Sequence, residues 1–111
     1  MIDWKSLTQI VWLFVAVHFS PLSHAEVIWI DVRSQAEYDV DNIEGDIRIT
    51  HDNIVQGVSD ISLEKNATIY LYCRSGRRAG IAMLALQEAG YTQVSNKGGM
   101  SDVREARGLI E

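Results

Sequence analysis

The sequence predicts an α/β domain whose central sheet is mainly parallel and flanked by helices. Two strand-like runs, Val27–Val32 and Ala67–Tyr72, alternate with helix-like segments. The first run is almost continuously apolar and β-branched, which is typical of a strand buried on both faces. In such sheets ligands bind beyond the carboxyl ends of the strands. The only cysteine, Cys73, lies at such an end.

The elements of the first half follow the Val27–Val32 strand. Ser34 suits an N-cap, and Glu37 three residues later completes a capping box. A short helix is therefore expected through Glu37 and Tyr38. Residues 43–49 alternate in their second half, which predicts a short strand. Residues 52–58 predict a short helix.

The second half contains the stronger helix signal. Residues 78–89 are apolar around most of the helix circumference, so we expect this helix to pack deep against the sheet. Gly90 suits the C′ position that ends it. Residues 93–95 predict a further short strand, Gly98-Gly99 a tight turn, and Ser101 the cap of a final helical turn.

The first 25 residues differ from the rest of the chain. An apolar run at Leu7–Phe19 is followed by a break with small residues at Ser23 and Ala25, the pattern of a secretory signal peptide cleaved after Ala25. The run is shorter than the roughly 20 residues that span a bilayer. An uncleaved N-terminal anchor is the alternative. We therefore expect an exported single domain of residues 26–111.

Composition restricts the classes of partner. The net charge of −5 and the pI near 5.1 argue against non-specific nucleic-acid binding, so any anion site must be a local cluster of positive charge. One cysteine forms no internal disulfide and no dithiol redox cycle. In an exported chain, an odd thiol indicates intermolecular pairing or a reactive site.

The stretch that begins at Cys73 combines this thiol with basic residues. Arg74, Arg77 and Arg78 surround the predicted start of a helix, where cations are normally disfavoured. With Gly76 giving the turn its freedom, successive backbone N–H groups can converge on one centre and form an anion site. A thiol at that centre ionises readily. The alternatives are arginines that point into solvent and an inert core cysteine.

Other catalytic arrangements have little support. His51 is the only histidine beyond the predicted signal peptide, and it reads as an ordinary surface residue, so a Cys–His dyad is weakly supported. Activation of the thiol would then depend on amides and arginines. One cysteine and one histidine without characteristic spacing predict no metal site, and no cofactor motif is present.

Five segments together resemble the rhodanese family of sulfurtransferases. They are Ile30–Arg33, similar to its DVR signature; Glu37-Tyr38; Asn42–Ile49, similar to its HIxGAxNI element; Tyr72–Ala79, similar to its CRSGxRS active loop; and Gly98–Met100, similar to its glycine pair. The resemblance covers nearly all of the chain after residue 25. It implies the rhodanese-like fold, with an active loop between a strand and a helix N-terminus, and the small periplasmic single-domain type.

The resemblance also implies a chemistry. A Cys73 persulfide would carry sulfur from thiosulfate to cyanide or to a thiol acceptor, without a metal or another cofactor. The implied substrate-binding residues follow the cysteine directly: Arg74, Ser75, Gly76, Arg77, Arg78 and Ala79. We expect a monomer that binds neither nucleic acid nor, once mature, a membrane.

The chain departs from the family pattern at Asn42 (usually His), Asp46 (usually Ala), Arg48 (usually Asn), Thr50 (often Pro) and Ala79 (often Ser). These differences leave the nucleophile unchanged. They bear on local packing and on substrate preference.

Two nearby residues are assigned to the fold. Asp31 and Arg33 are expected to support the structure rather than the chemistry. The i,i+4 spacing also allows an ion pair between Arg33 and Glu37.

Two rival functions remain. A phosphatase or arsenate reductase of the same fold needs cysteine, five residues and then arginine, but that last position is Ala79, and Arg78 follows after only four. The shorter loop favours a sulfur substrate. A non-enzymatic persulfide carrier or binding module in the cell envelope is the second alternative.

Overall fold

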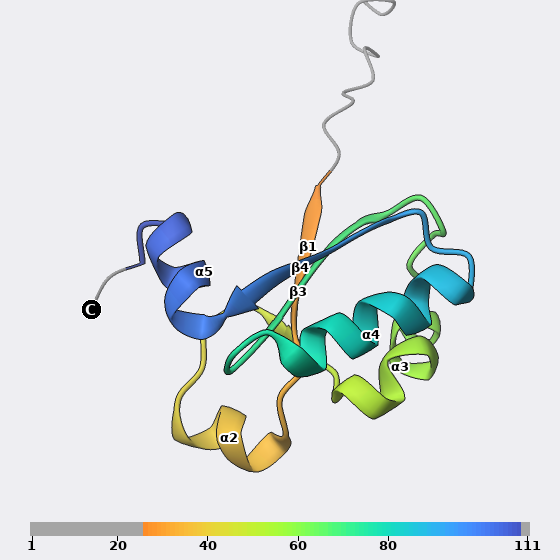
Figure 1. Cartoon of the computed structure of the whole chain (residues 1–111). Coiled ribbons are helices and arrows are strands. Elements are labelled where there is room, and N and C mark those ends of the chain that lie inside the picture. The colour runs from red at the N-terminus through yellow and green to blue at the C-terminus, as the bar shows by residue number, and fades with distance from the viewer. Residues whose placement is uncertain (1–25, 110–111) are drawn as a thin grey trace, which may run out of the picture.

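The computed structural model describes residues 26–109, so the predicted signal peptide lies outside the described residues. A four-stranded sheet forms its centre (Figure 1). The strand order is β2-β1-β3-β4, and every neighbouring pair is parallel. The strands are β1 (Val27–Asp31), β2 (Ile47–Arg48), β3 (Thr68–Cys73) and β4 (Gln93–Gly99). The prediction of an α/β fold with a mainly parallel sheet is confirmed.

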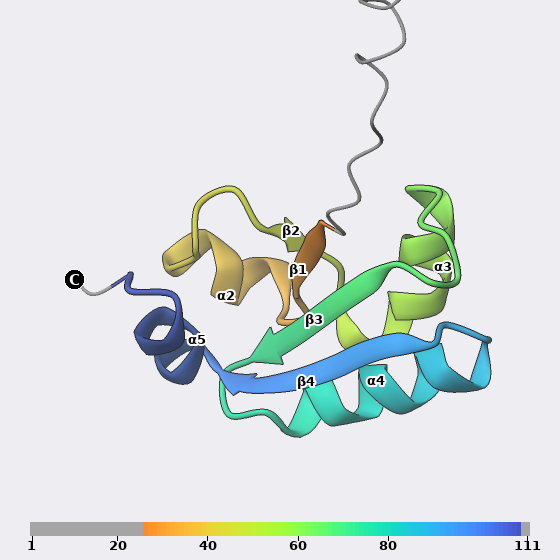
Figure 2. The same ribbon diagram turned by 90° about the horizontal axis from the view of Figure 1, so that it is seen from above.

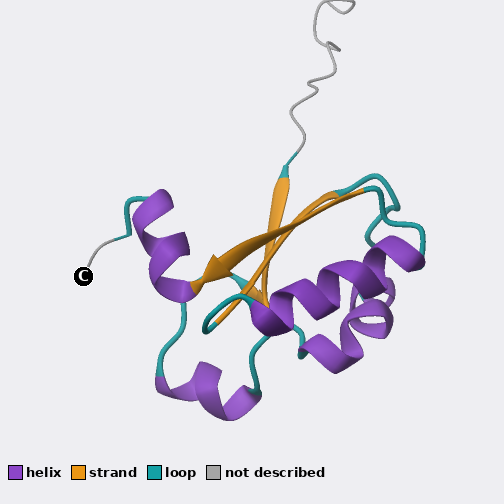
Figure 3. Ribbon diagram, in the orientation of Figure 1, coloured by secondary structure: helices purple, strands orange, loops and turns teal. Residues whose placement is uncertain are grey.

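Helices alternate with the strands, as Figure 3 shows. They are α2 (Gln35–Val40), the 3₁₀ turn η1 (His51–Asn53), α3 (Ile54–Asp60), α4 (Arg77–Glu88) and α5 (Met100–Ala106). Each helix expected from the sequence is present. Within residues 26–109, no helix has the length and apolar character needed to cross a membrane.

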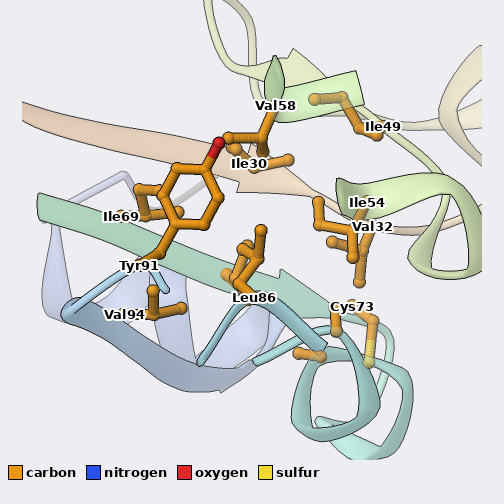
Figure 4. Packing of buried hydrophobic residues seen from close by; sticks show 13 residues of the cluster. Ile30, Val32, Ile49, Ile54, Val58, Ile69, Cys73, Leu86, Tyr91 and Val94 are labelled. Carbon is orange, nitrogen blue, oxygen red and sulfur yellow. The ribbon is translucent and has the colours of Figure 1, made fainter. Parts of the chain in front are cut away.

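The two faces of the sheet differ because side chains alternate along each strand. Ile30 and Ile69 belong to an aliphatic core shared with α3 and α4 (Figure 4). Trp29 and Tyr72 lie on the opposite face, in a smaller cluster with α5. Trp29 also meets Tyr70 edge-on, with ring centroids 5.1 Å apart.

The expected burial of two elements is only partly realised. Trp29 is half-buried, because α5 covers only part of the second face, so β1 is not buried along its whole length. The prediction that the α4 helix packs deep is wrong for Ile81 and Leu84, which are 45% and 59% exposed. One stripe, which includes Ala82 and Leu86, meets the sheet, and the opposite side of the helix faces solvent.

The helix ends follow local chemistry. The capping box at α2 is confirmed, since the Glu37 N–H donates to Ser34 Oγ and the Ser34 N–H donates to Glu37 Oε1. Gly90 follows α4 with a φ of 100°, as a C′ glycine does. Ser101 does not cap α5: the helix begins at Met100, and the preceding glycine donates its N–H to a side chain within the helix. The glycine pair before it ends β4 instead of forming a separate turn.

Asp31 and Arg33 are buried and bonded to each other. Arg33 Nη2 lies 2.8 Å from Asp31 Oδ2, and the Arg33 N–H also donates to this carboxylate. The i,i+4 pair of Arg33 with Glu37 is not formed. Ser34 is the N-cap, so Arg33 precedes the helix and the i,i+4 geometry does not apply to it.

Parallel strands bring their carboxyl ends to one edge of the sheet. Asp31, Arg48, Cys73 and Gly99 are the last residues of the four strands. In Figure 2 the arrows of β3 and β4 run toward the side on which α2 and α5 lie. The site therefore has to be sought between this edge and those two helices.

Candidate active site

The loop between β3 and α4 wraps around the sulfur of Cys73. Gly76 lies in the left-handed region with a φ of 99°, and the helix begins at the next residue. This conformation directs the Gly76 N–H to Cys73 Sγ, 3.0 Å away. Figure 4 shows Cys73 at the end of the aliphatic core, beside the start of α4. A bulkier residue at Gly76 would be strained.

The surroundings of Cys73 favour its thiolate. Burial raises the pKa of the thiol, but hydrogen bonds from backbone amides outweigh this effect and hold it below its ordinary value of 9.0. The amides belong to Ala79, Ser75, Gly76 and Arg78. No side chain caps the start of α4, so the sulfur occupies the place of a capping acceptor.

The three arginines of the loop are in different situations. Arg78 forms a two-pronged ion pair with Glu37 of α2, at 2.7 and 2.9 Å, and so ties that helix to the loop. The Arg78 hydrogen bond holds the pKa of the Glu37 carboxyl well below its ordinary value of 4.5. Arg74 and Arg77 are exposed and have no ion-pair partner within residues 26–109.

The remaining predicted positions contribute through the backbone. Ser75 is exposed, whereas the side chain of Ala79 is fully buried in the aliphatic core. Both amides favour the thiolate. The loop thus directs the amides of Ser75, Gly76, Arg78 and Ala79 toward the sulfur.

Two residues that support the loop were not predicted as part of the site. The Asn96 side chain donates to the Gly76 carbonyl at 2.9 Å and accepts from the Gly98 N–H at 2.9 Å. A Cβ on Gly99 would collide with the Arg74 carbonyl oxygen. The glycine pair, which was expected to form a tight turn, is the sequence feature that could have indicated this close backbone approach, whereas no sequence signal marked Asn96.

An open cleft of about 460 Å³ adjoins the loop between α2 and α5. It is lined by Arg33, Glu37, Val40, Asp41, Arg74, Met100, Ser101 and Arg104. Arg104 of α5 pairs with Asp41 at 2.9 Å. This ion pair joins the two walls of the cleft.

One departure from the family pattern, Asp46, is accommodated by new partners. Its carboxylate accepts from Tyr72 Oη at 2.7 Å and pairs with Arg107 at 2.8 Å. Burial and this carboxylate raise the pKa of the Tyr72 phenol. Arg107 in turn stacks 4.2 Å above the Trp29 ring. The departure therefore attaches the segment after α5 to the sheet.

The other departures before the loop also have partners. Arg48 donates to Gln35 at 3.0 Å and to Thr50 Oγ1 at 2.7 Å. Asn42 donates to the Tyr38 carbonyl at 2.9 Å. The Arg48–Gln35 bond joins β2 to α2, whereas the Asn42 bond is local to the end of α2.

His51 lies in η1 and is half-buried rather than a surface residue. Its Nδ1 is buried without a hydrogen-bond partner, and no described contact joins it to Cys73. Within residues 26–109, no group of three or more His, Cys, Asp or Glu side chains has the arrangement of a metal site.

Comparison with protein families matches residues 20–106 to the Rhodanese-like domain. The chain belongs to the rhodanese family. Among curated proteins it is similar to the Thiosulfate sulfurtransferase PspE of Escherichia coli (strain K12), with 36% identity over 82% of this chain and 88% of that protein. The expected resemblance to phage shock protein E is confirmed, and the chain is a sulfurtransferase.

Solved structures of rhodaneses share the fold. A "rhodanese with anions from E. coli" has 36% identity and a TM-score of 0.65, covering 69% of this chain and 91% of that one. The Rhodanese_3 like domain of the Alr3790 protein from Anabaena sp. has 31% identity and a TM-score of 0.65, over 75% and 94% of the two chains. The predicted rhodanese-like fold is confirmed.

Proposed function

We propose that this sulfurtransferase moves the sulfane sulfur of thiosulfate to cyanide or to a thiol through a persulfide on Cys73. One observation carries the proposal: the buried Cys73 sulfur accepts a hydrogen bond from Gly76, and amides around it lower its pKa. The relative PspE is named a thiosulfate sulfurtransferase, and a related rhodanese structure is described with anions.

The first step loads the enzyme. The Cys73 thiolate attacks the outer sulfur of thiosulfate, a bond forms between the two sulfurs, and the bond to the sulfonate sulfur breaks. Its electron pair leaves with sulfite, and the persulfide keeps one negative charge. The amides that favour the thiolate also stabilise this charge, as oxyanion-hole donors do.

The second step unloads it. Cyanide or a thiolate attacks the outer sulfur of the persulfide, and the electron pair of the sulfur–sulfur bond returns to Cys73. The products are thiocyanate or an acceptor persulfide, together with the starting thiolate.

The three arginines of the loop contribute to binding of the dianionic donor in different ways. Arg74 and Arg77, which are exposed and unpaired within residues 26–109, attract it. Arg78 adds positive charge close to Cys73 but remains held by Glu37. Ser75, Gly76 and Ala79 bind through their backbone.

A non-enzymatic persulfide carrier or binding module is the alternative, and the retained Cys73 argues against the latter. A phosphatase of this fold needs an arginine at the position that Ala79 occupies, and the side chain of Ala79 is buried in the core. We further propose that residues 1–25 are a signal peptide and that residues 26–111 work as a monomer in the periplasm.

Mass spectrometry of the mature protein after treatment with thiosulfate tests the proposal. We expect a gain of one sulfur on Cys73, lost again when cyanide is added, and sulfite release in the coupled assay. The Cys73→Ser variant should neither gain sulfur nor turn over. Turnover that persists in this variant would remove Cys73 as the nucleophile, and an enzyme that takes up no sulfur would favour the binding module.

A further inference from the structure

We propose that the cleft between α2 and α5 binds the sulfur acceptor, and that this acceptor is a small organic thiol carrying a carboxylate. The inference rests on the proposed sulfur-transfer function. The cleft adjoins the loop at Arg74, which follows Cys73 and lines the cleft. Glu37 of α2 also lines it and pairs with Arg78 at the start of α4.

The size of the cleft indicates an organic molecule. Thiosulfate and cyanide are ions of five and two atoms, whereas the cleft has about 460 Å³. Clefts of about 300–1,000 Å³ accommodate organic ligands of many atoms. The donor and cyanide leave most of this space unused, so it fits a larger second substrate.

The charges that line the cleft indicate an anionic group. Arg33 is paired with Asp31, and Arg104 has Asp41 as a partner. The carboxylate of Glu37 is in turn matched by Arg78 outside the lining. Arg74 is the lining arginine without a carboxylate partner within residues 26–109, so an acceptor carboxylate complements it.

The two walls also present apolar side chains. Val40 is the last residue of α2 and is 87% exposed, and Met100 of α5, although only 8% exposed, also lines the cleft. One exposed valine is ordinary on a protein surface. Its place in the cleft lining, however, suits the hydrocarbon stem of an acceptor whose carboxylate lies at Arg74.

The reaction balances without a further reactant. The acceptor thiolate attacks the outer sulfur of the Cys73 persulfide and forms a new sulfur–sulfur bond. The old bond breaks, its electron pair returns to the Cys73 sulfur, and the acceptor leaves as a persulfide anion.

The experiment isolates the unloading step. The enzyme is loaded with thiosulfate and desalted, and loss of the extra sulfur is followed by mass spectrometry with 3-mercaptopropionate, 2-mercaptoethanol, 2-aminoethanethiol or cyanide. Each acceptor is compared with itself across variants, so differences in intrinsic thiol reactivity cancel. Preloading also removes any effect of a variant on donor binding.

Arg74→Gln should raise the half-saturating concentration of 3-mercaptopropionate about two- to fivefold at low salt, and should lower that of 2-aminoethanethiol. Arg74→Lys, which keeps the charge, should restore most of the binding. Val40→Ser should weaken 3-mercaptopropionate and 2-mercaptoethanol alike by about twofold. The matched controls are Lys65→Gln, which lies just before the start of β3 at the end away from Cys73, and Val55→Ser on α3. Neither should change the half-saturating concentration of these thiols.

The outcomes separate the two proposals. An enzyme that takes up no sulfur from thiosulfate contradicts the proposed function. An enzyme that loads and is unloaded by cyanide, but whose response to the acceptors does not change in Arg74→Gln and Val40→Ser, keeps that function and overturns the acceptor class. Such an enzyme would favour a protein thiol as the acceptor.

Discussion

The ion pair between Arg78 and Glu37 gives the sharpest prediction for the active loop. Arg78→Ala removes the guanidinium that holds both oxygens of the Glu37 carboxylate. It therefore takes one positive charge from the neighbourhood of Cys73 and leaves one negative charge there without a partner. Both stability and donor binding should suffer.

The structure sets the size of the loss. The side chains are 25% and 30% exposed, between a surface pair and a buried one, and the contact is bidentate. We expect Arg78→Ala to cost about 1–2 kcal/mol of unfolding free energy. For a domain of this size that lowers the melting temperature by about 4–8 °C per kcal/mol.

The pH dependence follows from the pKa of Glu37, which the pair holds below its ordinary value of 4.5. A carboxyl whose folded-state pKa is depressed contributes stability above the unfolded value and loses it as pH falls through the folded value. Thermal unfolding at pH 7 should therefore separate the wild type from Arg78→Ala, and the difference should shrink at pH values below 4.5. A gap that stays constant into acid would refute the ion-pair explanation.

Three further predictions concern the support of the site. Gly99→Ala places a Cβ against the Arg74 carbonyl, so it should cost about 1–3 kcal/mol and most of the turnover, measured by thermal unfolding and sulfite release. Asn96→Ala removes the two hydrogen bonds that join this side chain to Gly76 and Gly98, and it should lower turnover with a stability loss of about 1–2 kcal/mol. Unchanged turnover would show that these two bonds are not needed for activity. Arg107→Ala leaves the Asp46 carboxylate, 6% exposed, without its cation and should cost about 2–4 kcal/mol in denaturant unfolding, whereas adding Asp46→Ala should recover most of that loss.

Local features of this site were predictable because they depend on neighbours in sequence. The strand before Cys73, the positive φ of Gly76 and the capping box of Ser34 with Glu37 each follow from a few adjacent residues. The rhodanese-like fold was implied by the resemblance of five segments to the rhodanese family, and it was confirmed. The interpretation of α4 failed where it depended on what covers the helix: its sequence contains apolar residues on several sides, but only one side meets the sheet.

Side-chain partners distant in sequence were not predictable. Glu37 and Arg78 are 41 residues apart, and they meet because β1 and β3 are adjacent in the sheet and end at the same edge. Asn96 reaches Gly76 for the corresponding reason, since β4 lies beside β3. Residue spacing alone offered Arg33 as the partner of Glu37, but Arg33 precedes the helix start and is held by Asp31.

The Glu37–Arg78 pair also distinguishes between two roles for Arg78 in catalysis. If Arg78 acts by its charge, the Michaelis constant for thiosulfate follows the local charge: it rises about two- to fivefold in Arg78→Ala, falls by a similar factor in Glu37→Gln, and returns near the wild-type value in the double variant. If Arg78 only positions the loop, all three variants raise the constant, because each breaks the same contact. Glutamine still serves the capping box, so Glu37→Gln keeps α2 intact while it removes the charge. We expect the first pattern, because Arg78 carries its positive charge close enough to Cys73 for the two to interact electrostatically. A rise of the Michaelis constant in Glu37→Gln would contradict this and make Arg78 a positioning residue.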